Sequence, residues 1–137
     1  MQTKVINLTL YVILDSNFLL IPSQFQVDIF EELEKLLNQQ FEPVLLNPMY
    51  QELLRIAEHG LPKLRQQASL ALALAEKCGI VSVEMYDREN PDDVILRVAK
   101  EWRCPVATND KELRKRLRRE GVPVLSLIHI SEPTRPY

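Results

Sequence analysis

Short apolar runs alternate with longer segments of helical periodicity along most of this chain. The apolar runs fall at 12–15, 43–46, 80–84, 104–108 and 122–125, and each has the length of a buried strand. Between them, apolar residues recur every three or four positions, as on one face of an amphipathic helix. Strands joined by helical crossovers predict an α/β fold with a mostly parallel five-stranded sheet and helices on both faces.

The ends of several predicted helices are marked by residues that start or stop helices. In segment 48–60, Pro48 stands near the start and Gly60 at the end, which is their usual distribution. Segment 61–79 contains an alternating Leu–Ala run, but these residues are strong helix formers and the segment is long, so we predict a helix. The other predicted helices cover 26–37, 91–102 and 110–121.

Length and composition are those of one globular domain. The chain has 137 residues, of which 46% are hydrophobic and 26% charged, and its net charge is −2. No apolar run reaches the roughly 20 residues of a membrane span, and no signal-peptide pattern opens the chain. We therefore expect a cytoplasmic protein with no membrane partner. The cysteines and histidines do not have the spacing of a zinc site.

Two predicted strands end on a carboxylate. Asp15 closes the run 12–15, and Asp110 follows the run 104–108 after one further residue. An unpaired charge is costly to bury, so an aspartate at the end of a core strand needs a partner or a function. Ligands of parallel sheets bind beyond the carboxyl ends of the strands. If these two strands are neighbours, both carboxylates face one crevice.

A third carboxylate lies beside the apolar face of the predicted helix 48–60. With residues placed at 100° intervals, Met49, Leu53 and Ile56 form the buried stripe of this helix. Glu52 falls on the flank of that stripe. A glutamate that faces inward calls for a specific reason.

A fourth carboxylate lies in the predicted helix 91–102, whose inner face is marked by Ile95, Ala99 and Trp102. Asp92 shares this face, whereas the neighbouring Asp93 points the opposite way. The helical period therefore selects Asp92 as the inward acid.

Each of these acids also has an ordinary structural role open to it. Asp15 can cap a short turn after its strand, and Asp110 can cap the helix that follows it. Asp92 lies in a first helical turn, where the helix dipole favours a carboxylate. Glu52 can pair with Arg55. One shared cause, however, accounts for all the acids together, and it is a hard divalent cation.

Carboxylate oxygens are the ligands that Mg²⁺ and Mn²⁺ prefer. Like charges raise one another's pKa, so convergent carboxylates are unfavourable until a cation neutralises them. A bound cation polarises a phosphoryl oxygen and lowers the pKa of an attacking water. We therefore predict a Mg²⁺ or Mn²⁺ site for phosphodiester hydrolysis, with four catalytic and metal-binding residues: Asp15, Glu52, Asp92 and Asp110.

The segment after Asp110 is strongly basic. On a helical wheel its cations spread over one side, while Leu113 and Leu117 mark the buried side. Such a surface is either an ordinary solvated helix face or a track for a nucleic-acid backbone leading to the metal site. The candidate phosphate-binding residues are Lys111, Arg114, Lys115, Arg118 and Arg119.

Four stretches, in this order, give the chain a resemblance to PIN-domain nucleases: VILDSNFLL, MYQELL, DDVILRVA and VATNDKEL. The resemblance covers about residues 11–124. It implies a three-layer fold with strand order 3-2-1-4-5, RNA as the substrate, and hydrolysis that depends on Mg²⁺ or Mn²⁺. It places the family's acids on Asp15, Glu52, Asp92 and Asp110, with Ser16, Asn17, Thr108 and Asn109 as supporting polar groups.

Within that family the chain is most similar to archaeal relatives of the ribosomal-processome PIN endonucleases, which implies ribosomal RNA processing. VapC-type toxins are the next neighbours, and a toxin would have an antitoxin partner; a homodimer is compatible with both roles. A non-catalytic PIN-like RNA-binding module is disfavoured because all four acid positions are filled. A phosphatase-like domain is disfavoured because Asn17 stands where it would need a second acid.

The last residues differ in character from the rest of the chain. Residues 125–135, LSLIHISEPTR, resemble the translated sequence of a sequencing-library adapter. Segments of this kind are left out of fold reasoning, so we expect residues 125–137 to lie outside the domain. The predicted domain covers 1–124, with 1–10 either an extension or a lengthening of the first strand.

Overall fold

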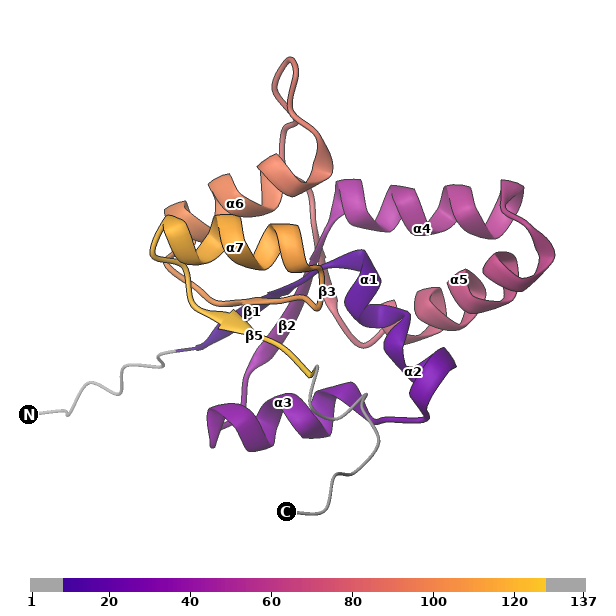
Figure 1. Ribbon diagram of the computed structural model, residues 1–137, viewed down its shortest axis with the longest axis horizontal. Coiled ribbons are helices and arrows are strands. Elements are labelled where there is room, and N and C mark those ends of the chain that lie inside the picture. Colours follow the sequence, from indigo (N-terminus) through magenta and orange to yellow (C-terminus); the bar gives the residue numbers. More distant parts are fainter. Residues whose placement is uncertain (1–8, 128–137) are drawn as a thin grey trace, which may run out of the picture.

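A central sheet of five parallel strands organises the computed structural model, which describes residues 9–127 (Figure 1). The spatial order of the strands is β3-β2-β1-β4-β5, so the predicted fold class and strand order are confirmed. The strands are β1 (Tyr11–Leu14), β2 (Glu42–Leu46), β3 (Gly79–Val81), β4 (Val106–Ala107) and β5 (Val124–Leu125).

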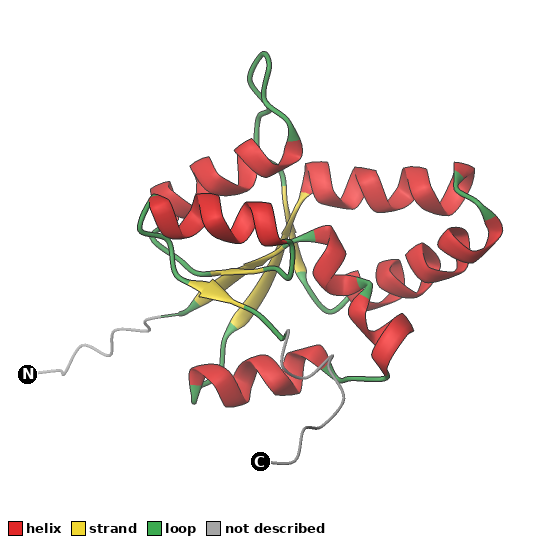
Figure 2. Ribbon diagram, in the orientation of Figure 1, coloured by secondary structure: helices red, strands yellow, loops and turns green. Residues whose placement is uncertain are grey.

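Helices cover both faces of this sheet (Figure 2). In Figure 1, α6 and α7 lie on one side of it and α3 on the other, while α4 runs on from the carboxyl end of β2 with α5 packed beside it. The helices are α1 (Ser16–Leu19), α2 (Ile21–Phe25), α3 (Ile29–Leu37), α4 (Asn47–His59), α5 (Pro62–Ala75), α6 (Pro91–Trp102) and α7 (Lys111–Arg119). In the described part of the chain, no helix has the length and apolar character needed to cross a bilayer.

The centre of the core is β1, which lies between β2 and β4. Val12, Ile13 and Leu14 are fully buried, because helices cover the strand on both faces. A strand buried on both faces is a continuous apolar run rather than an alternating one. Each such side chain contributes roughly 1.5–3 kcal/mol by leaving water. The chain leaves this core directly at Asp15, which fixes where that carboxylate stands.

The ends of two helical segments differ from the predicted ones. Helix α3 begins at Ile29 rather than at residue 26, because the Asp28 carboxylate accepts hydrogen bonds from the backbone N–H groups of Phe30 and Glu31, each at 3.1 Å. This is N-capping, which starts a helix at the following residue. The region after Asp15, interpreted from the sequence as a short turn, forms the two short helices α1 and α2.

The inner face of α6 also differs from the predicted one in a single residue. Ile95 and Ala99 are buried as expected, together with Val94 and Val98. Trp102, which the helical period places on this face, is 37% exposed because it is the last residue of the helix. Its ring meets that of Tyr11 edge to face, with centroids 6.2 Å apart.

The predicted domain boundary after residue 124 falls inside β5. The backbone N–H of Thr108 donates to the carbonyl of Leu125 at 3.0 Å, so Leu125 is paired in the sheet. Leu127 is 1% exposed and belongs to the hydrophobic core. Residues 125–127 are therefore packed against the domain, whatever their origin. The rest of the adapter-like segment, like residues 1–8, lies outside the described residues.

We predict that Leu127→Ala lowers the free energy of unfolding by about 2 kcal/mol, since truncating a buried leucine leaves a cavity. Leu36→Ala in α3 is the matched control, because that leucine is 52% exposed. The measurement is urea unfolding followed by circular dichroism. Equal effects of the two substitutions would show that the packed domain ends at residue 124.

Candidate active site

One cleft of about 320 Å³ collects the four acids singled out from the sequence. Each comes from a different part of the fold: the ends of β1 and β4, the middle of α4 and the first turn of α6. All four parts meet at the carboxyl ends of the strands, which is where parallel sheets bind ligands. The cleft is lined by Asp15, Ser16, Asn17, Glu52, Asn90, Pro91, Asp92 and Asp110.

Asp15 is the most buried of these acids, with 4% of its surface exposed. Its backbone N–H donates to the carbonyl of Ala107 at 3.0 Å, which holds the end of β1 against β4. Its side chain accepts a hydrogen bond from Thr108 Oγ1 at 2.8 Å. Within the described chain the side chain makes no capping hydrogen bond to α1, so capping does not account for this residue.

The Thr108 hydroxyl ties the two strand-end acids together. It donates to Asp15 Oδ2 and accepts from the backbone N–H of Asp110 at 3.0 Å. A hydroxyl has one proton to give and two lone pairs, so this pairing is well matched to its capacity. Asp110 in turn caps α7 by accepting from the backbone N–H of Leu113 at 3.0 Å. Asp110 therefore both caps α7 and lines the cleft.

Glu52 is held by a hydroxyl rather than by a basic residue. Ser16 Oγ donates to Glu52 Oε1 at 2.8 Å, which joins the start of α1 to the middle of α4. Arg55, the alternative partner considered from the sequence, is exposed on the same helix. Asn17 is exposed and lines the cleft beside Ser16.

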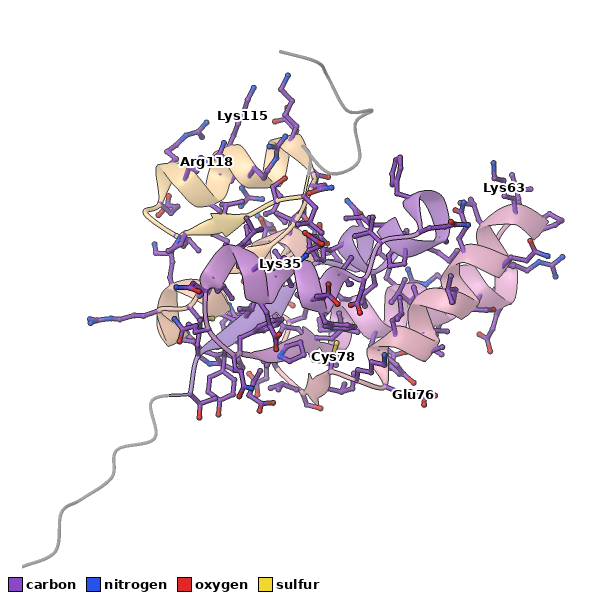
Figure 3. All side chains as sticks on the ribbon, turned by 90° about the horizontal axis from the view of Figure 1, so that it is seen from below. Lys35, Lys63, Glu76, Cys78, Lys115 and Arg118 are labelled. Atoms are coloured by element: carbon purple, nitrogen blue, oxygen red, sulfur yellow. The ribbon has the colours of Figure 1, made fainter. Side chains whose placement is uncertain are left out.

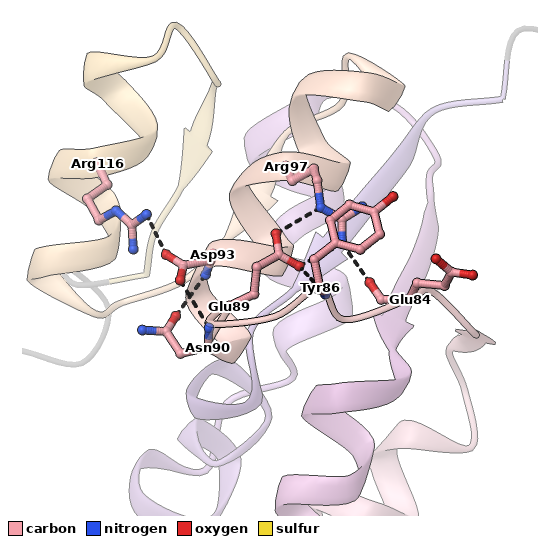
Figure 4. Close-up of polar contacts among 7 residues, drawn as sticks. All are labelled: Glu84, Tyr86, Glu89, Asn90, Asp93, Arg97 and Arg116. Atoms are coloured by element: carbon pink, nitrogen blue, oxygen red, sulfur yellow. Dashed lines mark hydrogen bonds and ion pairs between the residues drawn. The ribbon is translucent and has the colours of Figure 1, made fainter.

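The neighbouring acids Asp92 and Asp93 lie in different surroundings. Asp92 lines the cleft, whereas Asp93 forms a reciprocal capping box with Asn90 and an ion pair with Arg116 Nη2 at 2.7 Å (Figure 4). The arrangement agrees with the helical period, which turned Asp93 away from the acids. Asp93 therefore joins α6 to α7.

Asn90 lines the cleft although the sequence did not single it out, whereas Asn109, predicted as a supporting polar group, does not line it. Asn90 precedes Pro91, and an Asn–Pro pair before a helical period is a start signal that points to an N-cap. Asn109 Oδ1 instead accepts from Ser126 Oγ at 2.8 Å and from the backbone N–H of Leu127 at 2.9 Å. Its amide holds the chain after β5, a contact that no local pattern indicates.

Burial and mutual repulsion disfavour the charges in the cleft. The pKa of Asp15 is raised to about 6 as the net result of several causes: burial raises it most, the Thr108 hydrogen bond lowers it, and the negative charges of Asp92 and Glu52 raise it. The pKa of Asp92 is also raised, first by burial and then by the charge of Asp110, against a lowering by Arg116. With a pKa of about 6, Asp15 is nevertheless mostly ionised at neutral pH. The cleft therefore favours a cation.

The oxygen donors of the cleft suit a hard cation that keeps several waters, rather than an ion fully enclosed by protein ligands. Every charged group in the cleft is a carboxylate, and oxygen ligands suit Mg²⁺ and Mn²⁺. Within residues 9–127 no three Asp, Glu, His or Cys side chains converge closely enough to enclose an ion. Protein-bound Mg²⁺ commonly takes one or two carboxylates and keeps several waters or substrate phosphates. An open cleft lined by carboxylates suits that mode of coordination.

The basic surface begins where the cleft ends, because Lys111 directly follows Asp110. Leu113 and Leu117 are fully buried, which leaves the opposite side of α7 to its cations. Figure 3 shows Lys115 and Arg118 reaching outward from this helix. Of the predicted phosphate-binding residues, four are exposed and Arg114 is half-buried: Lys111, Arg114, Lys115, Arg118 and Arg119.

Comparison with known proteins gives a family. Residues 12–129 match the model of the PIN-like domain. Ribonuclease VapC4 of Methanocaldococcus jannaschii is 36% identical over 112 residues, which cover 81% of this chain and 85% of that protein. The rRNA-processing protein fcf1 of Schizosaccharomyces pombe is 29% identical over 118 residues, which cover 85% of this chain but only 58% of fcf1.

Solved structures agree with the assignment to the PIN-like domain family. The PIN domain endonuclease Utp24 superposes with a TM-score of 0.70 and 30% identity, over 85% of this chain and 84% of that one. VapBC2 of Rickettsia felis, solved with a promoter DNA fragment, has a TM-score of 0.63 over 85% of this chain and 98% of that one. At 13% identity this second match supports the fold alone. The chain therefore belongs to the PIN-like domain family and is related to its nucleases.

Proposed function

We propose that this protein is a Mg²⁺- or Mn²⁺-dependent endoribonuclease that hydrolyses RNA phosphodiester bonds in ribosomal RNA processing. The observation that carries the proposal is the convergence of four carboxylates, from four parts of the fold, on one cleft. The same observation disfavours a non-catalytic RNA-binding module, which has no need to keep repelling charges together.

When bound, the cation would polarise a phosphoryl oxygen and lower the pKa of a water that attacks in line with the leaving oxygen. The residues that would hold such an ion, one or two directly and the others through its waters, are Asp15, Glu52, Asp92 and Asp110. Thr108 links the two strand ends, because its hydroxyl donates to the Asp15 carboxylate and accepts from the backbone N–H of Asp110. An ionised carboxylate in the cleft can also take the proton that the water gives up.

The relatives support ribosomal RNA processing and also keep a second role open. The names of fcf1 and Utp24 give rRNA processing and a PIN domain endonuclease. The more identical relative, at 36%, is ribonuclease VapC4, which favours an alternative role as a toxin ribonuclease with an antitoxin partner. Both roles have RNA as the substrate, and a cytoplasmic location is part of the proposal for either. An antitoxin gene beside this one would favour the toxin, and ribosomal genes would favour processing.

The neighbouring acids of α6 offer a matched test of the mechanism. We predict that Asp92→Asn lowers the cleavage rate of single-stranded RNA in Mg²⁺ by about 100-fold, because it removes a carboxylate charge that would help to hold the cation. Asp93→Asn removes the same charge one residue away and leaves the rate within about threefold. The measurement is cleavage of an RNA labelled with a fluorophore and a quencher.

Two results would contradict this mechanism. Cleavage that continues undiminished in EDTA would exclude the divalent ion. A larger loss of cleavage rate in Asp93→Asn than in Asp92→Asn, with both variants folded by circular dichroism, would show that Asp93 and not Asp92 serves the reaction.

The basic surface of α7 predicts a change in salt dependence. Lys115→Ala together with Arg118→Ala should make the logarithmic slope of RNA affinity against salt shallower by about 1.4, or about 0.7 for each lost phosphate contact on a single strand. Both side chains are exposed, so the free energy of unfolding should change by less than about 0.5 kcal/mol for each. The measurement is a salt titration of affinity in Ca²⁺, chosen to suppress cleavage.

The control is Lys35→Ala together with Lys63→Ala, which changes the net charge equally but lies on α3 and α5 (Figure 3). An equal slope change in the control would mean that net charge alone, and not α7, attracts the RNA. An unchanged slope in the α7 variant would make its basic face an ordinary solvated surface.

A further inference from the structure

The connection between β3 and α6, residues 82–90, is clamped by one arginine of α6. Arg97 Nε donates to Glu89 Oε2 at 2.9 Å and its Nη2 donates to Glu89 Oε1 at 3.0 Å. The same Nη2 also donates to the backbone carbonyl of Glu84 at 2.6 Å (Figure 4). A bidentate arginine–carboxylate pair with a third bond to the backbone fixes the loop firmly against the helix.

This clamp presents Tyr86 in one orientation. Arg97 Cζ lies 4.1 Å from the centroid of the Tyr86 ring, which is the geometry of a cation–π contact. The backbone N–H of Tyr86 donates to Glu89 Oε1 at 2.8 Å, so backbone and ring are both held. Although one face of the ring is covered, Tyr86 remains 53% exposed. The exposed surface is therefore mostly that of the opposite face.

The platform formed by Tyr86 and Arg97 is joined to the cleft by a short piece of chain. Tyr86 precedes the cleft residue Asn90 by four positions, so their Cα atoms are at most about 14 Å apart. Two further cleft residues, Pro91 and Asp92, follow directly. Figure 1 shows the loop projecting beyond the start of α6, at the top of the view. A strand of RNA that lies in the cleft and extends over the start of α6 would come within a few nucleotides of this ring.

The charges of the loop disfavour a phosphate as the group that meets Tyr86. Glu84, Asp87 and Glu89 are acidic, against Arg88 and Arg97, so the loop and its clamp carry a net negative charge. Phosphates prefer the cations of α7 instead. An unpaired base is neutral and offers a flat π-face, which is what an exposed aromatic ring accepts with little dependence on sequence.

We propose that Tyr86, held from behind by Arg97, is a stacking platform for an unpaired base of the RNA that lies in the cleft. The inference rests on the proposed function, since it supplies a subsite for the same substrate. It makes single-stranded RNA beside the cut the preferred substrate, because a paired base has no free face to give.

The test is the binding of a single-stranded RNA that carries 2-aminopurine, whose fluorescence is quenched when the base stacks. The titration is done in Ca²⁺ with the full chain, so that its readout does not depend on cleavage. Tyr86→Ala should weaken binding about five- to thirty-fold, the lower part of the range for one stacked base, and should abolish the quenching. Tyr86→Phe keeps the ring and should bind like the wild type.

Two further measurements separate base stacking at Tyr86 from a change in charge and from a general loss of exposed aromatic surface. The salt slope of affinity should be unchanged in Tyr86→Ala, because a stacked base releases no counterions. Tyr11→Ala is the matched control. That tyrosine is 46% exposed but lies at the start of β1, away from the carboxyl ends of the strands where the cleft is, so RNA binding should not change.

Unchanged affinity and quenching in Tyr86→Ala would overturn the inference, and would leave this surface to a protein partner instead. An equal loss in Tyr86→Phe would also overturn it, because the hydroxyl and not the ring would then be the contact. Failure of the proposed function gives a different result: wild-type protein that binds RNA but does not cleave it in Mg²⁺. The fluorescence titration is informative in either case.

Discussion

The hydrogen bond between Thr108 and Asp15 is the contact on which the rest of the candidate site depends. It lies at the carboxyl end of the central strand, where β1 and β4 are paired. The pairing brings the ends of both strands together, and with them Asp15 and Asp110. Burial at this point raises the pKa of Asp15 to about 6, so the fold keeps a charge where it is unfavourable. A bound cation would offset that cost.

Ion pairing is distributed unequally around the cleft. In the described part of the chain, the acids that stabilise the frame have basic partners: Asp93 pairs with Arg116, and Glu89 with Arg97. No ion pair within residues 9–127 involves any of the four cleft acids, whose side chains are held by hydroxyls, by backbone N–H groups or by neither. The proposed divalent cation would supply the counter-charge that these ion pairs do not. This contrast distinguishes the acids that stabilise the frame from the four acids proposed as catalytic more clearly than burial does.

Hydrophobic periodicity is sufficient to predict the parallel α/β architecture and the orientation of Asp92 relative to Asp93, since both depend on regular spacing. The short helices α1 and α2 escape such a prediction because four or five residues are too few to show a helical period. The packing of Asn109 and Leu127 differs from the expected one because their contact joins residues 18 positions apart. Such tertiary contacts leave no local signal. The strand order itself came from the family resemblance.

The most direct test of the central claim is the thermal unfolding of the wild type and of Asp15→Asn, in EDTA and in Mg²⁺, at pH 7. Asparagine keeps an acceptor for Thr108 but removes the charge. Because the folded-state pKa of Asp15 is raised, its ionised form destabilises the fold above pH 6. We expect Asp15→Asn to melt higher than the wild type in EDTA and to gain less from Mg²⁺, which stabilises only the state that binds it. If Asp15→Asn instead melts lower than the wild type in EDTA and gains as much from Mg²⁺, the claim that the Asp15 charge destabilises the fold until a cation binds is contradicted.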